Sequence, residues 1–127
     1  MRAGLETMGR ALLCGLLLWL MPVAHAAGLS GQEHGSLPPI AVADLPSEAR
    51  TTLQLVKQGG PFPYARDGVV FGNFEKRLPR QPRGYYREYT VKTPGVRNRG
   101  ARRIVCGQLP ECYYTDNHYQ SFKRIRE

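Results

Sequence analysis

The sequence predicts an α+β domain in which one N-terminal helix packs on a twisted antiparallel β-sheet. A single segment with helical spacing of apolar residues comes first, and a run of short segments with strand composition follows it, joined by loops rich in glycine and proline. One helix followed by a run of strands is the element order of an α+β fold. The 127 residues leave room for one small domain.

The helix is predicted over residues 46–58. Ala49, Leu53 and Val56 recur at helical spacing, so they form an apolar stripe that must pack on the strands. The proline at the start suits a first helical position. The pair Gly59-Gly60 ends the helix, because glycine readily adopts the left-handed conformation that follows a helix C-terminus.

Five later segments have the composition of β-strands. The clearest is the segment 85–91, which is dense in Tyr, Thr and Val. Turn sequences at 67–68 (Asp-Gly) and 93–95 (Thr-Pro-Gly) separate strands. The predicted strands are residues 69–71, 85–91, 102–105, 113–115 and 118–125.

The first 26 residues have the organisation of a secretory signal peptide. Arg2 and Arg10 precede an apolar run over residues 11–23, and Ala24-His25-Ala26 gives the small-x-small pattern that signal peptidase reads. The apolar run is shorter than the roughly 20 residues that a membrane-spanning helix needs. We therefore expect cleavage near Ala26 and a secreted protein, either periplasmic or extracellular.

Residues 27–40 are rich in Gly, Ser and Pro, so they predict a flexible lead-in and place the folded domain at residues 41–127. The chain carries a formal net charge of +8 at pH 7. Such a charge attracts polyanions and favours nucleic acid or an anionic membrane as the partner, with solubility alone as the plainer explanation. A membrane-acting cationic protein is disfavoured, because no long basic amphipathic helix is predicted.

Cys106 and Cys112 remain after the predicted cleavage. An exported protein meets an oxidising compartment, so a disulfide between them is the default expectation. Together with His118 they also form a Cys-x5-Cys-x5-His pattern. Three ligands are one short of a closed zinc site, and we expect no metal.

Three kinds of chemically useful side chain follow one another in the C-terminal half. Alternation along the segment 85–91 puts Glu88 on one face with Tyr86 and Thr90, and Arg103 of the next strand can meet Glu88 across the sheet. His118 follows. A carboxylate, a guanidinium cluster and an imidazole supply the base, the cations and the acid that metal-free RNA cleavage needs. Taken singly, these residues are more commonly an exposed strand carboxylate, a solvated basic turn and a surface histidine. The arginine cluster is Arg97, Arg99, Arg102 and Arg103.

The residues around this trio match a known family over most of the chain, from residue 45 to about residue 125. The matching segments are GPFPY at 60–64, DGVVF at 67–71, GYYREYTV at 84–91, TPG at 93–95, RGARRI at 99–104 and YYTDNHY at 113–119. With these segments the chain resembles the secreted microbial guanyl-specific ribonucleases, the family of barnase and ribonuclease Sa. The resemblance implies the microbial ribonuclease fold and an enzyme that uses no cofactor.

The resemblance also implies catalytic roles for individual residues. Glu88 matches the general base of the family and His118 its general acid. Arg99 and Arg103 match the arginines that bind the phosphate, and Tyr119 matches a tyrosine that contacts the phosphate and shapes the site.

A second set of residues matches the guanine-recognition loop of the family: Phe71, Asn73 and Glu75. The family commonly has Asn-Arg-Glu in this loop, whereas the present chain has Phe74 in the middle position. Guanine preference is expected to persist if that residue contributes mainly its backbone amide, whereas selectivity or affinity is expected to shift if its charge matters. The disulfide that joins the two ends of similar ribonucleases has no counterpart here, and the pair Cys106 and Cys112 is expected to close one loop instead.

The expected activity is that of an exported, guanyl-preferring endoribonuclease that cleaves single-stranded RNA. The resemblance implies a metal-independent reaction through a 2′,3′-cyclic phosphate to 3′-phosphate ends, in a monomeric protein. A small acidic inhibitor similar to barstar is an expected partner besides RNA. The alternative is a catalytically inactive basic RNA-binding relative, which the presence of Glu88, Arg103 and His118 together disfavours.

Overall fold

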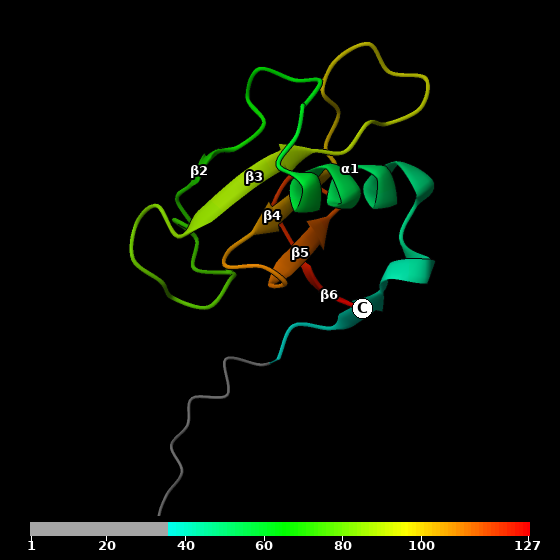
Figure 1. The fold of residues 1–127 in the computed structure, drawn as a ribbon. Helices are drawn as coiled ribbons and strands as arrows, with labels where there is room; N and C mark the ends of the chain where they lie inside the picture. Colours follow the sequence, from blue (N-terminus) through cyan, green and yellow to red (C-terminus); the bar gives the residue numbers. More distant parts are fainter. Residues whose placement is uncertain (1–35) are drawn as a thin grey trace, which may run out of the picture. The chain divides into compact units, whose positions relative to one another are not determined.

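The computed structural model describes residues 36–127, which form one helix packed on a six-stranded sheet (Figure 1). The α+β prediction is confirmed. The predicted signal peptide and residues 27–35 of the predicted lead-in lie outside the described residues. No helix within residues 36–127 is long and apolar enough to cross a membrane. The elements are β1 (Pro39–Ala41), the 3-10 helix η1 (Val42–Asp44), α1 (Ser47–Gln58), β2 (Val69–Phe71), β3 (Tyr86–Thr90), β4 (Arg103–Cys106), β5 (Cys112–Thr115) and β6 (Lys123–Arg126).

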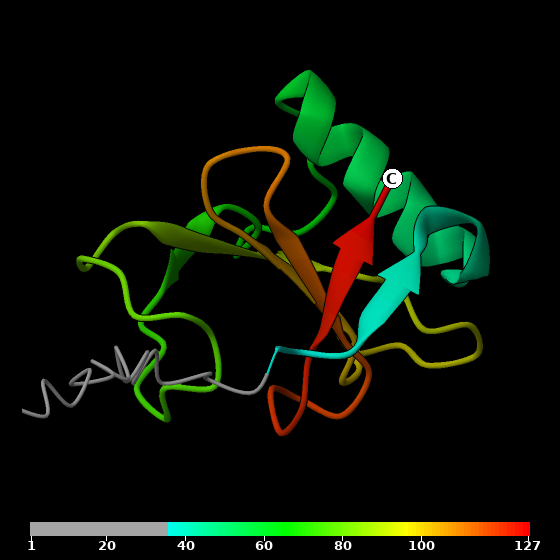
Figure 2. The same cartoon turned by 90° about the horizontal axis from the view of Figure 1, so that it is seen from below.

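The strands are ordered β1-β6-β5-β4-β3-β2, and every neighbouring pair except β1–β6 is antiparallel. Strand β1 lies parallel to β6, with Pro39 opposite Arg124 and Ala41 opposite Arg126 (Figure 2). This strand was not predicted, and residues 39 and 40 therefore belong to the sheet and not to a flexible lead-in. Its three residues are too few to show alternation, and its partner comes from the other end of the domain.

Helix α1 ends where the sequence predicts. Gly59 adopts φ 80° and donates its N–H to the carbonyls of Leu55 and Val56, which closes the last turn. Pro46 precedes the first helical residue, as the N-cap. The helix buries Leu53 to 4% exposure, which stabilises the fold by roughly 2 kcal/mol relative to an exposed leucine.

The last strand begins later than predicted, at Lys123. His118 and Tyr119 have φ angles of 55° and 68°, and this left-handed conformation is incompatible with a strand. The segment before β6 is therefore a tight loop that leads away from the end of β5.

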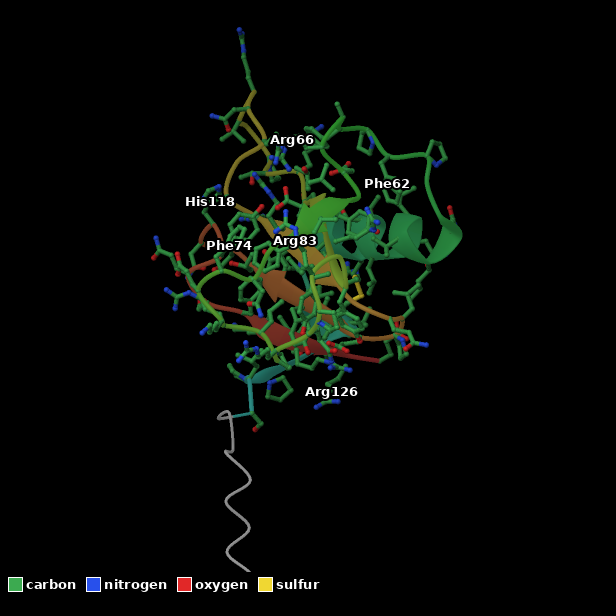
Figure 3. The ribbon with its side chains drawn as sticks, turned by 90° about the vertical axis from the view of Figure 1, so that its left-hand side faces the viewer. Phe62, Arg66, Phe74, Arg83, His118 and Arg126 are labelled. Atoms are coloured by element: carbon green, nitrogen blue, oxygen red, sulfur yellow. A yellow bond between two sulfur atoms is a disulfide. The ribbon has the colours of Figure 1, made fainter. Side chains whose placement is uncertain are left out.

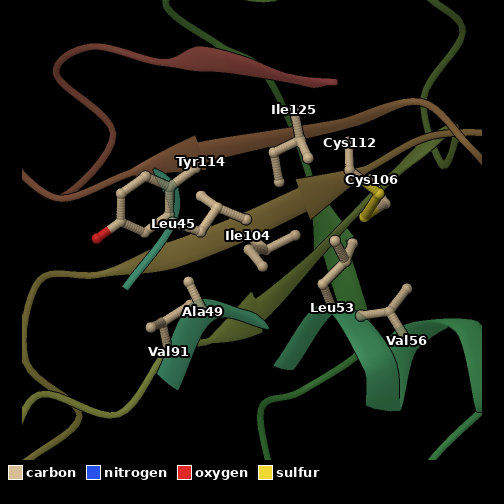
Figure 4. Close-up of a cluster of buried hydrophobic side chains, with 10 residues drawn as sticks. All are labelled: Leu45, Ala49, Leu53, Val56, Val91, Ile104, Cys106, Cys112, Tyr114 and Ile125. Carbon is tan, nitrogen blue, oxygen red and sulfur yellow. A yellow bond between two sulfur atoms is a disulfide. The ribbon is translucent and has the colours of Figure 1, made fainter. Parts of the chain in front are cut away.

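The main core lies between α1 and one face of the sheet (Figure 4). Alternation along β3, β4 and β5 brings every second side chain to this face. The buried members are Leu45, Ala49, Leu53, Val56, Val91, Ile104, Cys106, Cys112, Tyr114 and Ile125.

A second, smaller core lies on the face of the sheet that points away from α1. Tyr86 of β3, Val105 of β4 and Tyr113 of β5 form its floor, and Leu78 and Phe122 cover them. The Tyr86 hydroxyl donates to the carbonyl of Pro79 at 2.6 Å, which ties the loop between β2 and β3 to this face. The rest of the face is left for polar side chains.

The predicted disulfide between Cys106 and Cys112 is present. The two residues are paired across β4 and β5, so the bond closes the end of this hairpin. Within residues 36–127 no group of three or more His, Cys, Asp or Glu residues is arranged to hold a metal ion.

Buried tyrosines limit the stability of the fold at alkaline pH. Burial, followed by the hydrogen bond to Glu111, raises the pKa of Tyr113 to about 12, and burial also raises the pKa of Tyr86. An unfolded tyrosine ionises near pH 10, so above that pH the unfolded chain loses protons first and unfolding becomes more favourable. The contribution of Tyr113 to the free energy of unfolding should therefore be constant up to about pH 10. It should decrease between pH 10 and 12, by on the order of 1 kcal/mol after solvent screening.

Urea unfolding at a series of pH values measures this effect. The Tyr113→Phe variant should show a shallower decline between pH 10 and 12 than the unmodified chain. An identical slope in both proteins would mean that Tyr113 ionises equally readily in the folded and unfolded states.

Candidate active site

A buried carboxylate lies on the sheet face that points away from α1. Glu88 of β3 is opposite Val105 of β4, and Thr90 is opposite Arg103, so Glu88 and Arg103 are diagonal neighbours on one face, as the alternation predicts. Glu88 is 7% exposed and Arg103 is 3% exposed. Two buried charges side by side on a sheet must be satisfied by specific partners.

Two hydrogen bonds hold the Glu88 carboxylate. Arg99 Nη2 donates to Oε1 at 3.4 Å, and the Tyr119 hydroxyl donates to Oε2 at 2.8 Å. Arg99 is itself fixed by Thr90, whose Oγ1 accepts from Nε at 3.1 Å and from Nη2 at 2.9 Å. These contacts compensate the cost of removing a carboxylate from water and fix the direction of its oxygens.

Arg103 is held by the loop that it supports. Its Nη1 donates to the carbonyl oxygens of Arg99 at 3.3 Å, Gly100 at 3.0 Å and Arg102 at 2.7 Å, and its Nε donates to the Tyr119 hydroxyl at 3.2 Å. These contacts among the described residues use two of its three nitrogens and leave Nη2 for another acceptor. The guanidinium is thus rigidly placed before any ligand arrives.

Tyr119 joins the two charged residues. Its hydroxyl donates to Glu88 and accepts from Arg103. Burial, and then the hydrogen bond to Glu88, raises the pKa of Tyr119 to about 12, so the hydroxyl stays protonated at neutral pH. Its ring stacks on Phe71, with the ring centroids 5.2 Å apart.

His118 lies beside this cluster, with its ring centroid 4.8 Å from that of Tyr119, and its side chain is exposed (Figure 3). Two backbone hydrogen bonds hold the left-handed loop. The His118 N–H donates to the Ala101 carbonyl at 2.9 Å, and the Tyr119 N–H donates to Thr115 Oγ1 at 3.2 Å. Non-glycine residues in this conformation cost about 1–3 kcal/mol each, a cost that is typical of functional sites.

A pocket of about 180 Å³ adjoins the cluster, and we call it the loop pocket. Asn73 shapes its wall: the side chain donates to the Leu78 carbonyl at 3.0 Å and accepts from the Leu78 N–H at 3.1 Å. Glu75 projects from the same loop, and its Oε2 accepts from Arg77 Nε at 2.9 Å and lies 2.7 Å from Nη2. The residues that line this pocket are Phe71, Asn73, Phe74, Glu75, Arg77, Tyr119 and Phe122.

The structure therefore brings Glu88, Arg99, Arg103, His118 and Tyr119 together, and it places Phe71, Asn73 and Glu75 in one adjoining pocket. The remaining arginines of the predicted cluster do not join the site. Arg97 is exposed. Arg102 lies near Tyr114 on the helix side of the sheet, where its charge opposes the rise that burial causes in the pKa of Tyr114.

Three supporting residues were not predicted. Thr90 orients Arg99, Thr115 holds the Tyr119 backbone, and Arg77 pairs with Glu75. Alternation puts Thr90 on the face of Glu88, which is the one sequence signal that could have found it. Nothing in the sequence connects Thr115 or Arg77 with its partner.

The chain is similar to known ribonucleases in sequence and in fold. A family model described as ribonuclease matches residues 29–126. Guanyl-specific ribonuclease Sa3 of Kitasatospora aureofaciens is 56% identical over 87 residues, which is 68% of this chain and 62% of that protein. Guanyl-specific ribonuclease St of Saccharopolyspora erythraea is 54% identical over 84 residues, 66% of this chain and 83% of that protein.

Solved structures of a further relative, ribonuclease Sa2, superpose on the chain. The structure of Sa2 complexes with mononucleotides has a TM-score of 0.71 at 48% identity, and covers 72% of this chain and 96% of that one. The crystal structure of Sa2 with guanosine-2′-cyclophosphate has a TM-score of 0.68, also at 48% identity, and covers 72% and 97%. The chain belongs to the ribonuclease family, among the guanyl-specific microbial members.

Replacing Arg103 should destabilise the fold as well as the site. In Arg103→Met the loop carbonyls and the Tyr119 hydroxyl lose their donor, and Glu88 loses a neighbouring positive charge. We expect a loss of about 2–4 kcal/mol in the free energy of unfolding, measured by urea denaturation.

The matched control is Arg97→Gln, which removes an exposed arginine of the same loop and should change the free energy of unfolding by less than about 0.5 kcal/mol. If both variants unfold at the same urea concentration, the buried hydrogen bonds of Arg103 contribute nothing to stability.

Proposed function

We propose that this protein is an endoribonuclease that cleaves single-stranded RNA after guanosine through a 2′,3′-cyclic phosphate. One observation carries the proposal: the buried Glu88 carboxylate is held by Arg99 and Tyr119, with Arg103 behind the tyrosine and His118 beside it. A base, an acid and positive charge around one point are what RNA transphosphorylation needs. A catalytically inactive RNA-binding relative would not need a base, an acid and phosphate-binding cations together.

In the first step Glu88 takes the proton of the ribose 2′-hydroxyl while that oxygen attacks phosphorus. The bond from phosphorus to the 5′-oxygen of the next nucleotide breaks, and protonated His118 gives this oxygen its proton. The products are a 2′,3′-cyclic phosphate and a free 5′-hydroxyl. In the second step the roles reverse: His118 takes a proton from water, the water oxygen attacks phosphorus, and Glu88 returns a proton to the 2′-oxygen, which leaves a 3′-phosphate.

Arg99, Arg103 and Tyr119 stabilise the charge that builds up on the phosphate oxygens in the transition state. Guanidinium groups suit this position because their planar fork donates to two oxygens and stays charged. Tyr119 stays protonated, because its pKa is raised, and its hydroxyl donates to Glu88 in the free protein. Once Glu88 has taken the 2′-hydroxyl proton, the Tyr119 hydroxyl can turn to the phosphate as a neutral donor. The two arginines are already fixed by hydrogen bonds, so little reorganisation of their guanidinium groups is needed during the reaction.

The loop pocket supplies the preference for guanine. Guanine presents N1–H and the N2 amino group side by side, and the two oxygens of Glu75 can accept from both. Arg77 holds the Glu75 carboxylate at the pocket, whereas the amide of Asn73 is occupied by Leu78 and keeps the loop in shape. The stacked rings of Phe71 and Tyr119 offer a flat wall for a base.

Phe74 is compatible with this assignment. Its side chain is 82% exposed, and a Cβ at Gly72 would lie 2.5 Å from its ring, so the phenyl group packs on the Gly72 backbone at the rim of the pocket. An apolar side chain at this position leaves the Glu75 oxygens unobstructed by a second cation. Structures of the similar ribonuclease Sa2 with guanosine-2′-cyclophosphate and 3′-GMP support a guanine nucleotide as the ligand.

The proposal includes export and a protein partner. The signal-peptide pattern of residues 1–26 supports secretion, and an exported ribonuclease endangers the RNA of the cell that makes it. A small acidic inhibitor similar to barstar would fit the cationic site formed by Arg99 and Arg103. Its charge would replace that of the RNA phosphates.

Glu88 and His118 should limit the activity at opposite ends of the pH range. The first step needs the carboxylate ionised and the imidazole protonated, so kcat/KM for the dinucleotide GpU should be bell-shaped in pH. Glu88→Gln should remove the acidic limb and His118→Gln the alkaline limb, each with a loss of about 10²–10⁴-fold. EDTA should change neither the rate nor the profile.

Asp116→Asn is the matched control, since it removes an exposed carboxylate two positions from His118 and should alter kcat/KM by less than about twofold. Cleavage at a near-normal rate by either active-site variant would overturn the proposed mechanism.

Glu75 should determine the choice of base. In Glu75→Gln one acceptor oxygen becomes a donor that faces the donors of guanine, and a bidentate contact of this kind is worth roughly 1–3 kcal/mol. The ratio of kcat/KM for GpU to that for ApU should therefore fall by about tenfold or more. An unchanged ratio would show that Glu75 does not contact the base.

A further inference from the structure

A second pocket lies next to the loop pocket and takes no part in the mechanism above. It has a volume of about 180 Å³, and we call it the arginine pocket. Three arginines line it, together with Tyr113, Leu78 and Pro79. The arginines are Arg77, Arg124 and Arg126.

Strand alternation places this pocket on the catalytic face of the sheet. In β6, Ile125 points into the core under α1, so Arg124 and Arg126 on either side of it point to the other face. Arg124 is opposite Tyr113 of β5, which belongs to the core on that same face. Both arginines therefore lie on the side of the sheet that carries Glu88.

Arg124 has one hydrogen bond on the floor of the pocket and keeps further donors without an acceptor. Its guanidinium carbon lies 5.3 Å from the centroid of the Tyr113 ring, and its Nη1 donates to the Tyr113 hydroxyl at 3.2 Å. Its Nε is buried and has no hydrogen-bond partner among the described residues. Its Nη2 likewise has no acceptor among the described residues, so this nitrogen is left for a ligand oxygen in the pocket.

The charges around the pocket favour an anion. Arg126 is exposed, and no carboxylate is among the described residues that line the pocket. Arg77 pairs with Glu75, which lines the neighbouring loop pocket. Glu111 accepts from the hydroxyls of Tyr113 and Tyr85, so one negative charge lies beyond Tyr113. Three guanidinium groups against two carboxylates leave the pocket positive.

The arginine pocket adjoins the loop pocket at Arg77, which lines both. Tyr119, which contacts Glu88 and Arg103, lines only the loop pocket. The order along this face is therefore catalytic cluster, loop pocket and arginine pocket. RNA that leaves a bound guanosine in the 3′ direction passes through the reacting phosphate, so the 5′ direction remains for the arginine pocket.

We propose that the arginine pocket is an RNA subsite that binds the phosphate on the 5′ side of the recognised guanosine. Arg124 and Arg126 donate to this phosphate, and the apolar surfaces of Tyr113, Leu78 and Pro79 contact the preceding nucleotide. This inference rests on the proposed ribonuclease function. The subsite makes the enzyme favour guanosines inside an RNA chain over a guanosine at the 5′ end.

The test compares GpU with pGpU, which carries one additional 5′-phosphate, and with the trinucleotide UpGpU. Charged hydrogen bonds to one phosphate should raise kcat/KM for pGpU about tenfold over GpU, mainly through KM. The plot of log KM against log salt should be steeper for pGpU by about 0.7, the value for one phosphate contact on a single strand. UpGpU should gain at least as much.

Arg126→Gln and the double variant Arg124→Gln/Arg126→Gln should lose this gain, the double variant completely, and both should cleave GpU within about twofold of the unmodified rate. Arg126→Gln alone keeps the contact between Arg124 and Tyr113, so a folding defect cannot account for its loss. Arg66→Gln is the matched control: it removes an exposed arginine that lies at the opposite end of the view from Arg126 (Figure 3), and it should retain the full gain.

Binding of uncleavable 2′-deoxy dinucleotides, with and without a 5′-phosphate, separates this proposal from the catalytic one. Tighter binding of the phosphorylated form, lost in Arg126→Gln, supports the subsite even if GpU is not cleaved. Equal kcat/KM and equal affinity with and without the 5′-phosphate would overturn it, as would a gain that Arg66→Gln abolishes and Arg126→Gln retains.

Discussion

The buried charge of Glu88 is the constraint on which the rest of the site depends. A carboxylate that is 7% exposed needs donors, and Arg99 and Tyr119 provide them. Each donor needs its own support, which comes from Thr90 for the arginine and from Arg103 and Phe71 for the tyrosine. Arg103 in turn holds the loop carbonyls that position Arg99. The network is closed, so a change at one member is transmitted to the others.

Strand alternation places the main core and the Glu88 cluster on opposite faces of the sheet. Alternate side chains of β3, β4 and β5 pack under α1, whereas the side chains between them form the Glu88 cluster and the smaller tyrosine-rich core. The disulfide lies at the end of the β4–β5 hairpin, on the helix side. On the face that carries Glu88, the area outside the smaller core is therefore left to polar groups, and the main core on the opposite face stabilises the sheet that fixes their directions.

The sequence predicted what depends on local pattern. Helical spacing located α1 to within one residue, alternation placed Glu88 and Arg103 on one face, and the family resemblance marked the remaining residues of the cluster. It did not predict contacts between distant segments. Strand β1 depends on pairing with β6, and the loop at His118 depends on hydrogen bonds to Ala101 and Thr115. The Arg77–Glu75 pair is close in sequence, but charge pattern alone does not distinguish it from two separately solvated side chains.

The parallel ladder of β1 and β6 has a topological consequence. Because Pro39 is opposite Arg124 and Ala41 is opposite Arg126, the first and last strands of the described domain run side by side in the same direction. The start of one and the end of the other are separated by little more than the length of a three-residue strand. A short linker can bridge that length, so the two ends of the described domain can be joined and new ends opened elsewhere, as in a circular permutant. Exposed loops such as the one around Arg97, which is far from this ladder in sequence, are the natural places for new ends, provided that Arg99 keeps its hold on Glu88.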